Sequence, residues 1–69
     1  MNQFKSIKEI LEFAITREQE SYQTYLSLME LTKDPDLYHT LESFANDELQ
    51  HKANLELELM KEGLTVDED

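Results

Sequence analysis

The scarcity of helix-breaking residues is the feature that most limits the folds open to this chain. Its 69 residues contain a single glycine, Gly63, and a single proline, Pro35. Because tight turns and hairpins between strands depend on these residue types, the chain has few places to reverse direction. The sequence therefore predicts an all-α fold of two long helices, separated just before Pro35 and ending near Gly63.

The first helix is predicted over about residues 7–32. Ser6 and Glu9 match the spacing of a capping box, in which the two side chains satisfy free N–H groups at a helix start. Beyond them, apolar residues recur at the spacing of one helix face. They are Ile7, Ile10, Leu11, Ala14, Ile15, Tyr22, Tyr25, Leu26, Leu28 and Met29. Glu18 falls at the centre of this stripe, where burial of an unpaired carboxylate is costly.

The second helix is predicted over about residues 35–62. Asp34 is a suitable N-cap, and Pro35 suits the first helical position because its missing N–H is not needed there. Gly63 is expected to cap the other end, with Leu64 folding back onto the helix. Residues 65–69 contain three acids and are predicted to be a frayed tail.

The second helix carries apolar residues over more than half of its circumference. One set has Glu48 near its middle and His51 on its flank, and it consists of Leu37, Leu41, Phe44, Ala45, Leu55 and Leu59. An adjoining set consists of Tyr38, Leu49, Ala53, Leu57, Met60 and Leu64. One partner helix cannot cover both sets, so we expect hairpins to associate. A chain of this size is also marginal alone, and without cysteine it has no disulfide to stabilise it.

The charge balance excludes several classes of partner. Sixteen acidic against six basic residues give a net charge of −10. Nucleic acids and anionic membranes are recognised through basic patches, so neither is expected as a partner. No apolar run approaches the ~20 residues of a membrane span, and the N-terminus lacks the apolar core of a secretory signal. The expected location is the cytoplasm.

Three side chains that can bind a metal are predicted to meet at one level. Glu48 and His51 are three residues apart, so they lie on one side of a helix, about one turn from each other. Glu18 lies sixteen residues before Asp34. The position sixteen residues after Asp34 falls between Glu48 and His51. Because both helices rise equally per residue, all three side chains should lie roughly 24 Å from the turn.

Each of these residues also has an ordinary interpretation. Glu18 could form a structural salt bridge, for which Lys52 is the one suitably placed cation. Glu48 could belong to a surface ion pair, and His51 alone would be an unremarkable histidine. Among the other candidates, Tyr25 lies two turns after Glu18 on the same face and either packs in the core or hydrogen-bonds a metal ligand. Three more residues are expected to be solvated surface: His39, Asp47 (which could otherwise orient the His51 imidazole) and Glu20.

One hairpin supplies half of the side chains that a di-iron site requires. Four-helix di-iron carboxylate proteins use one Glu from each of two helices and a Glu-x-x-His pair from each of the other two. Two identical hairpins related by a twofold axis would provide this set. The same association would cover the surplus apolar surface. We therefore predict a two-helix antiparallel hairpin that dimerises into a four-helix bundle, or assembles into a higher even-numbered homo-oligomer.

Two runs, Ala14-Ile15-Thr16-Arg17-Glu18 and Phe44-Ala45-Asn46-Asp47-Glu48-Leu49-Gln50-His51, resemble the iron-binding helices of rubrerythrins and other ferritin-like proteins. A two-helix chain with these motifs is similar to the encapsulated ferritins, which build a ferroxidase centre across a subunit interface. The resemblance implies that Glu18, Glu48 and His51 are iron ligands, with two ions per dimer, and that Tyr25 is a catalytic tyrosine near them. It also implies an encapsulin shell as partner and compartment. Leu64-Thr65-Val66 is similar to the opening of the shell-targeting tag, and Asp67-Glu68-Asp69 does not continue it.

The function expected from these features is oxidation of Fe(II) by O2 or peroxide, for iron storage or detoxification. Carboxylate oxygens and imidazole suit both oxidation states of iron. A rubrerythrin-like peroxide reductase is the alternative enzyme. A non-catalytic helical interaction module, free of metal or stabilised by zinc, is the alternative from another class.

Overall fold

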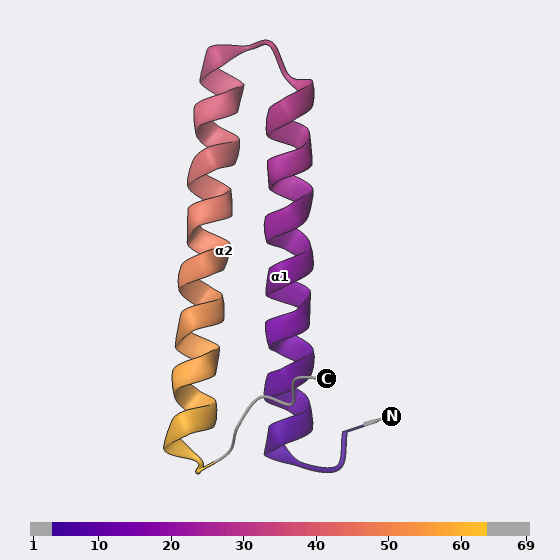
Figure 1. The fold of residues 1–69 in the computed structure, drawn as a ribbon, viewed down its shortest axis with the longest axis vertical. Coiled ribbons are helices and arrows are strands. Elements are labelled where there is room, and N and C mark those ends of the chain that lie inside the picture. The colour runs from indigo at the N-terminus through magenta and orange to yellow at the C-terminus, as the bar shows by residue number, and fades with distance from the viewer. Residues whose placement is uncertain (1–3, 64–69) are drawn as a thin grey trace.

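The computed structural model describes residues 4–63, and these form an antiparallel hairpin of two helices. The first helix, α1, spans Ile7–Leu31, and the second, α2, spans Pro35–Lys61. Figure 1 shows the two helices side by side along their length, with a short connection at one end. Within the described range there is no strand. The predicted all-α hairpin is confirmed, and each helix ends one residue before its predicted end.

Helix α1 begins where the capping pattern places its start. The Ser6 side chain accepts a hydrogen bond from the Glu9 backbone N–H at 3.1 Å. The Glu9 carboxylate accepts from the backbone N–H of Lys5 at 3.3 Å, one residue before the partner that a capping box would use. The helix start is thus fixed by local polar contacts that need no tertiary packing.

Helix α2 is capped at both ends by the residues around Pro35 and Gly63. Asp34 Oδ1 accepts from the backbone N–H groups of Asp36 at 2.9 Å and Leu37 at 3.3 Å. At the other end Glu62 is the C-cap, and Gly63 follows it with φ +72°. That left-handed conformation is one that only glycine adopts without strain. The predicted packing of Leu64 and the predicted tail at 65–69 lie outside the described residues.

The packing between the helices is apolar towards both ends and polar in the middle. Leu11, Ile15 and Leu59 form the buried core at the end away from the turn, with Leu55 packed against them. Towards the turn, the buried residues are Met29, Leu41 and Ala45. The partly buried polar side chains between these groups include Glu18, Gln19, Glu48 and Lys52. A polar layer at mid-length is costly to the fold unless its members find partners.

Much apolar surface is left uncovered by the hairpin. The large apolar side chains that remain exposed are Ile7, Ile10, Phe13, Leu28, Leu31, Leu37, Tyr38, Phe44, Leu49, Leu57 and Met60. They lie on both helices and along their full length, as expected of a chain that packs against further helices. In the described part of the chain, neither helix is long and apolar enough to cross a membrane.

Replacing the N-cap of α2 tests how far the hairpin depends on this turn. Asp34→Ala removes the acceptor for two backbone N–H groups, and we expect a loss of about 1 kcal/mol in the free energy of unfolding. Asp34→Asn keeps an acceptor oxygen and should stay close to wild type. Urea unfolding at matched protein concentration measures both. Equal stability of the two variants would contradict the capping role.

Candidate metal centre

Glu18, Glu48 and His51 converge at the middle of the hairpin. Glu18 comes from α1, and the other two residues come from α2. Each offers one ligand atom, and these three atoms lie within 4.8 Å of one another. The equal rise of the two helices from a short turn brings them to one level, as their spacing from Asp34 predicts. Their role as metal ligands stays a prediction.

The His51 imidazole lies between the two carboxylates. Its Nδ1 is 2.9 Å from Glu18 Oε2 and 3.1 Å from Glu48 Oε1. The side chains of Glu18 and Glu48 are only 21% and 15% exposed, whereas that of His51 is 59% exposed. The carboxylates therefore lie inside the hairpin, and the imidazole closes the group on its solvent side.

One oxygen of Glu18 is buried without a hydrogen-bond donor. Glu18 Oε2 is close to His51 Nδ1, but the contact lacks the geometry of a hydrogen bond, and no other described residue donates to it. A buried carboxylate oxygen that accepts nothing carries a desolvation cost of about 1–3 kcal/mol or more. A metal ion bound to this oxygen would remove that cost. The donor set of two carboxylates and one imidazole also suits iron, so the residues fit the ion that the sequence resemblance implies.

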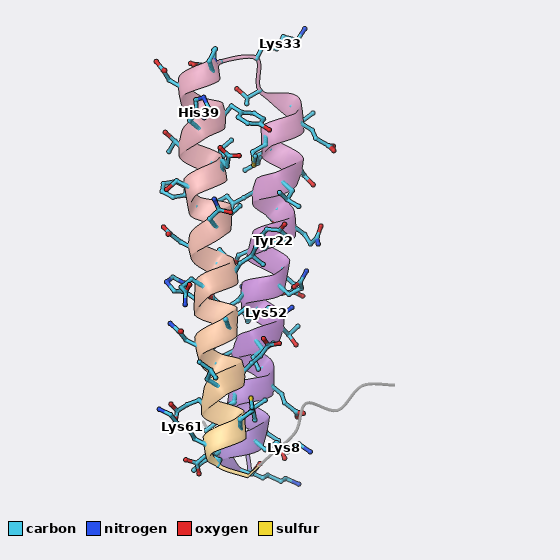
Figure 2. The ribbon with its side chains drawn as sticks, turned by 60° about the vertical axis from the view of Figure 1, so that its left-hand side comes forward. Lys8, Tyr22, Lys33, His39, Lys52 and Lys61 are labelled. Atoms are coloured by element: carbon cyan, nitrogen blue, oxygen red, sulfur yellow. The ribbon has the colours of Figure 1, made fainter. Side chains whose placement is uncertain are left out.

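No lysine or arginine among residues 4–63 forms an ion pair with either glutamate of the group. Figure 2 shows Lys33 at the turn, Lys8 and Lys61 at the opposite end, and Lys52 between them. Lys52 donates to Gln19 Oε1 at 2.8 Å, and Arg17 is paired with Glu20 at 3.3 Å. The salt bridge considered for Glu18 and Lys52 is therefore wrong, because the Lys52 ammonium is directed to an uncharged amide.

The other candidates lie outside this group. The Tyr25 ring packs on Phe44, with ring centroids 5.6 Å apart, and its catalytic role stays a prediction. His39 is exposed near the turn, and its Nδ1 lies 3.6 Å from Glu42. Asp47 is exposed, and so is Glu20 in its pair with Arg17. These positions agree with the solvated-surface interpretation for His39, Asp47 and Glu20.

The interhelical hydrogen bond between Lys52 and Gln19 was not expected from the sequence. The sequence did contain a pattern that could have predicted this bond. Gln19 directly follows Glu18, and Lys52 directly follows His51. Residues next to a facing pair are themselves brought to one level. The bond gives the polar layer a second partnered contact between the helices, beside the carboxylates.

The carboxylates raise the pKa of His51 above its ordinary value of 6.5. The hydrogen bond with Glu48 is the largest cause, partial loss of water opposes it, and the negative charge of Glu18 adds to the increase. Both carboxylates favour the protonated imidazole, which holds a positive charge where a metal ion would otherwise lie.

We expect the imidazole of His51 in metal-free protein to titrate above pH 6.5, with Glu48→Gln lowering its pKa back towards that value. Because the folded-state pKa exceeds the unfolded one, His51 stabilises the fold fully below about pH 6.5, and this contribution is lost as the pH rises through the folded-state pKa. NMR titration of the imidazole carbons measures the pKa. A wild-type value at or below 6.5 would contradict this geometry.

Comparison with protein families shows which family has a sequence pattern that includes Glu18, Glu48 and His51. The model of the rubrerythrin family matches residues 3–68, which is nearly the whole chain and includes all three members of the group. Comparison with curated proteins and with solved structures gives no significant match.

Proposed function

The chain belongs to the rubrerythrin family of ferritin-like di-iron proteins, and on that premise we propose that it is a ferroxidase whose di-iron site forms between two copies of the hairpin. The observation that carries the proposal is the convergence of Glu18, Glu48 and His51, with a buried Glu18 oxygen that lacks a donor. One hairpin supplies one Glu and one Glu-x-x-His pair. The four-helix di-iron set needs each of these twice.

The side of the hairpin beside the group is suited to receive the second copy. Leu37 and Phe44 precede His51 by fourteen and seven residues, so they lie along the same flank of α2. Both are nearly half exposed, at 46% and 45%. Ile7, eleven residues before Glu18, extends the same exposed side along α1. We call this surface, with His51 at its centre, the site face.

Within such a dimer, each residue has a role that its position supports. Glu18 and Glu48 would bridge or chelate the ions, because their carboxylates lie inside the hairpin and face the His51 ring. His51 would bind through Nδ1, the atom directed at both carboxylates. The apolar side chains of the site face would exclude water from the ligands once buried. An iron pair held there supplies two electrons, one from each Fe(II), for the two-electron reduction of O2 or peroxide.

The oxidised product would need a larger compartment for storage. Open surface grooves on the described hairpin have volumes of about 310 Å³ and about 580 Å³. Storage of mineral would therefore take place in a higher assembly or a separate container, for which an encapsulin shell remains our expectation. Detoxification of Fe(II) needs only the oxidation step.

Substitution of the ligands tests the site. Glu18→Ala and His51→Ala should each lower the rate of Fe(II) oxidation by more than about 100-fold, beyond the loss typical for residues that only support a metal ligand. Stopped-flow absorbance after mixing Fe(II) with O2, and separately with hydrogen peroxide, measures this rate and identifies the preferred oxidant. Circular dichroism should show that helical content is retained.

The chain contains a matched control for the histidine. His39 has a Glu three residues away on the same helix and is exposed near the turn. His39→Ala should oxidise Fe(II) at the wild-type rate. Wild-type rates in Glu18→Ala and His51→Ala would contradict the site assignment.

Metal binding and dimerisation should be coupled. Without metal, the site face of a dimer would bring four carboxylates together, and like charges at close range repel. Iron should shift the protein from monomers towards dimers, and a ligand at a hundred times its dissociation constant adds about 2.7 kcal/mol of stabilisation. Sedimentation of metal-free and iron-loaded samples at one concentration measures the shift. Monomers in both samples would exclude the shared di-iron site.

A further inference from the structure

Lys52 lies beside the ligand group but does not pair with it. It directly follows His51, and it comes four residues after Glu48 on α2. A Glu followed four residues later by a Lys is the better of the two orders for an ion pair on a helix. Among residues 4–63, however, Lys52 forms no ion pair with Glu48, nor with Glu56 four residues further on. The ordinary partner of this lysine is therefore within reach and is not used.

The ammonium group of Lys52 is bound by an amide of the other helix instead. Lys52 Nζ donates to Gln19 Oε1 at 2.8 Å, and both side chains are partly buried. A hydrogen bond with a charged donor is roughly twice as strong as one between neutral groups. An amide oxygen accepts such a bond without adding a further negative charge beside the two carboxylates. Gln19 thus competes successfully with the acids around Lys52.

The two carboxylates of the ligand group lie between His51 and the Lys52–Gln19 hydrogen bond. At about 100° per residue, three residues after Glu48 place His51 about 60° to one side of it, and four place Lys52 about 40° to the other. Gln19 follows Glu18 directly on α1, so its amide is brought to the same level of the hairpin. His51 closes the solvent side of the carboxylates, and the hydrogen bond closes the other side.

We propose that Gln19 is a positioning residue that keeps the Lys52 ammonium away from the ligand carboxylates. An ammonium bound to Glu48 or Glu18 would occupy an oxygen that a metal ion needs, and the ion would have to displace it. Bound to Gln19, the same charge still offsets part of the acid charge at longer range. The Glu18 Oε2 atom, which is buried and has no donor, is then left open for an ion. The inference rests on the proposed function only in taking Glu18, Glu48 and His51 as metal ligands.

Removal of the amide tests this role through metal affinity. Gln19→Leu removes the acceptor and keeps a side chain of similar size, so the released Lys52 should pair with Glu48. The affinity for Fe(II) should then fall by about tenfold, the lower end of the loss typical for residues that support a metal ligand. Calorimetric titration with Fe(II) in the absence of oxygen, at one protein concentration, measures the affinity. An unchanged affinity would overturn the proposal.

Gln50 provides a matched control for this substitution. It lies on α2 between Glu48 and His51, and its amide donates to Asn54 at 3.1 Å on the exposed side of the helix. Gln50→Leu removes an equal amide at the same level of the hairpin and should bind Fe(II) as wild type does. A loss in Gln50→Leu as large as that in Gln19→Leu would also overturn the proposal.

Replacement of the lysine separates this role from a purely structural one. Without the ammonium nothing competes for the carboxylates, so Lys52→Met should bind Fe(II) at least as tightly as wild type. The double variant Gln19→Leu/Lys52→Met should recover the affinity lost in Gln19→Leu. If the hydrogen bond only held the helices together, both single variants would lose it equally and the double variant would recover nothing. Weaker binding in Lys52→Met, or no recovery in the double variant, would overturn the proposal.

A crystal structure of metal-free Gln19→Leu locates the ammonium without dependence on iron. Lys52 Nζ should lie within hydrogen-bond distance of a carboxylate oxygen of Glu48 or Glu18. An ammonium directed to solvent would overturn the role of Gln19 and leave the proposed function intact. Conversely, the expected changes in affinity in a protein that binds Fe(II) without oxidising it would support the role of Gln19 and overturn the ferroxidase proposal.

Discussion

The carboxylate of Glu18 lies within the interface of the only two helices described, and the arrangement at mid-length depends on how its charge is balanced. In the hairpin it faces the His51 imidazole and has no hydrogen-bond donor for its buried oxygen. Lysines that could neutralise it lie at the ends or are directed elsewhere, as with Lys52 and Gln19. In the hairpin alone, the negative charge of Glu18 is therefore only partly balanced by neighbouring groups. A bound cation would supply the compensation, which links the stability of the fold to the metal proposed for it.

The same polar layer divides the packing of the hairpin. The apolar cores towards the turn and towards the open end are small, and among residues 4–63 only Leu59 has an exposed fraction below 2%, at 1%. Two helices of this length leave one side of each helix without a partner. Association of hairpins through the site face would bury the exposed apolar flank. The same contact would complete the set of metal ligands.

The helices and the level of the ligand group follow from the sequence alone. Local rules set these features: Ser6 and Asp34 cap the helix starts, Gly63 allows a left-handed residue after α2, and equal rise from a short turn brings Glu18 level with Glu48 and His51. The hydrogen-bond partner of each side chain in the polar layer depends instead on how the two helices pack. Lys52 could have reached Glu18 by its position, yet it donates to Gln19, and one Glu18 oxygen is left without a donor. Helical spacing gives height and rough direction, whereas rotamers and competing acceptors depend on the packed neighbours, and these exist only once the two helices meet.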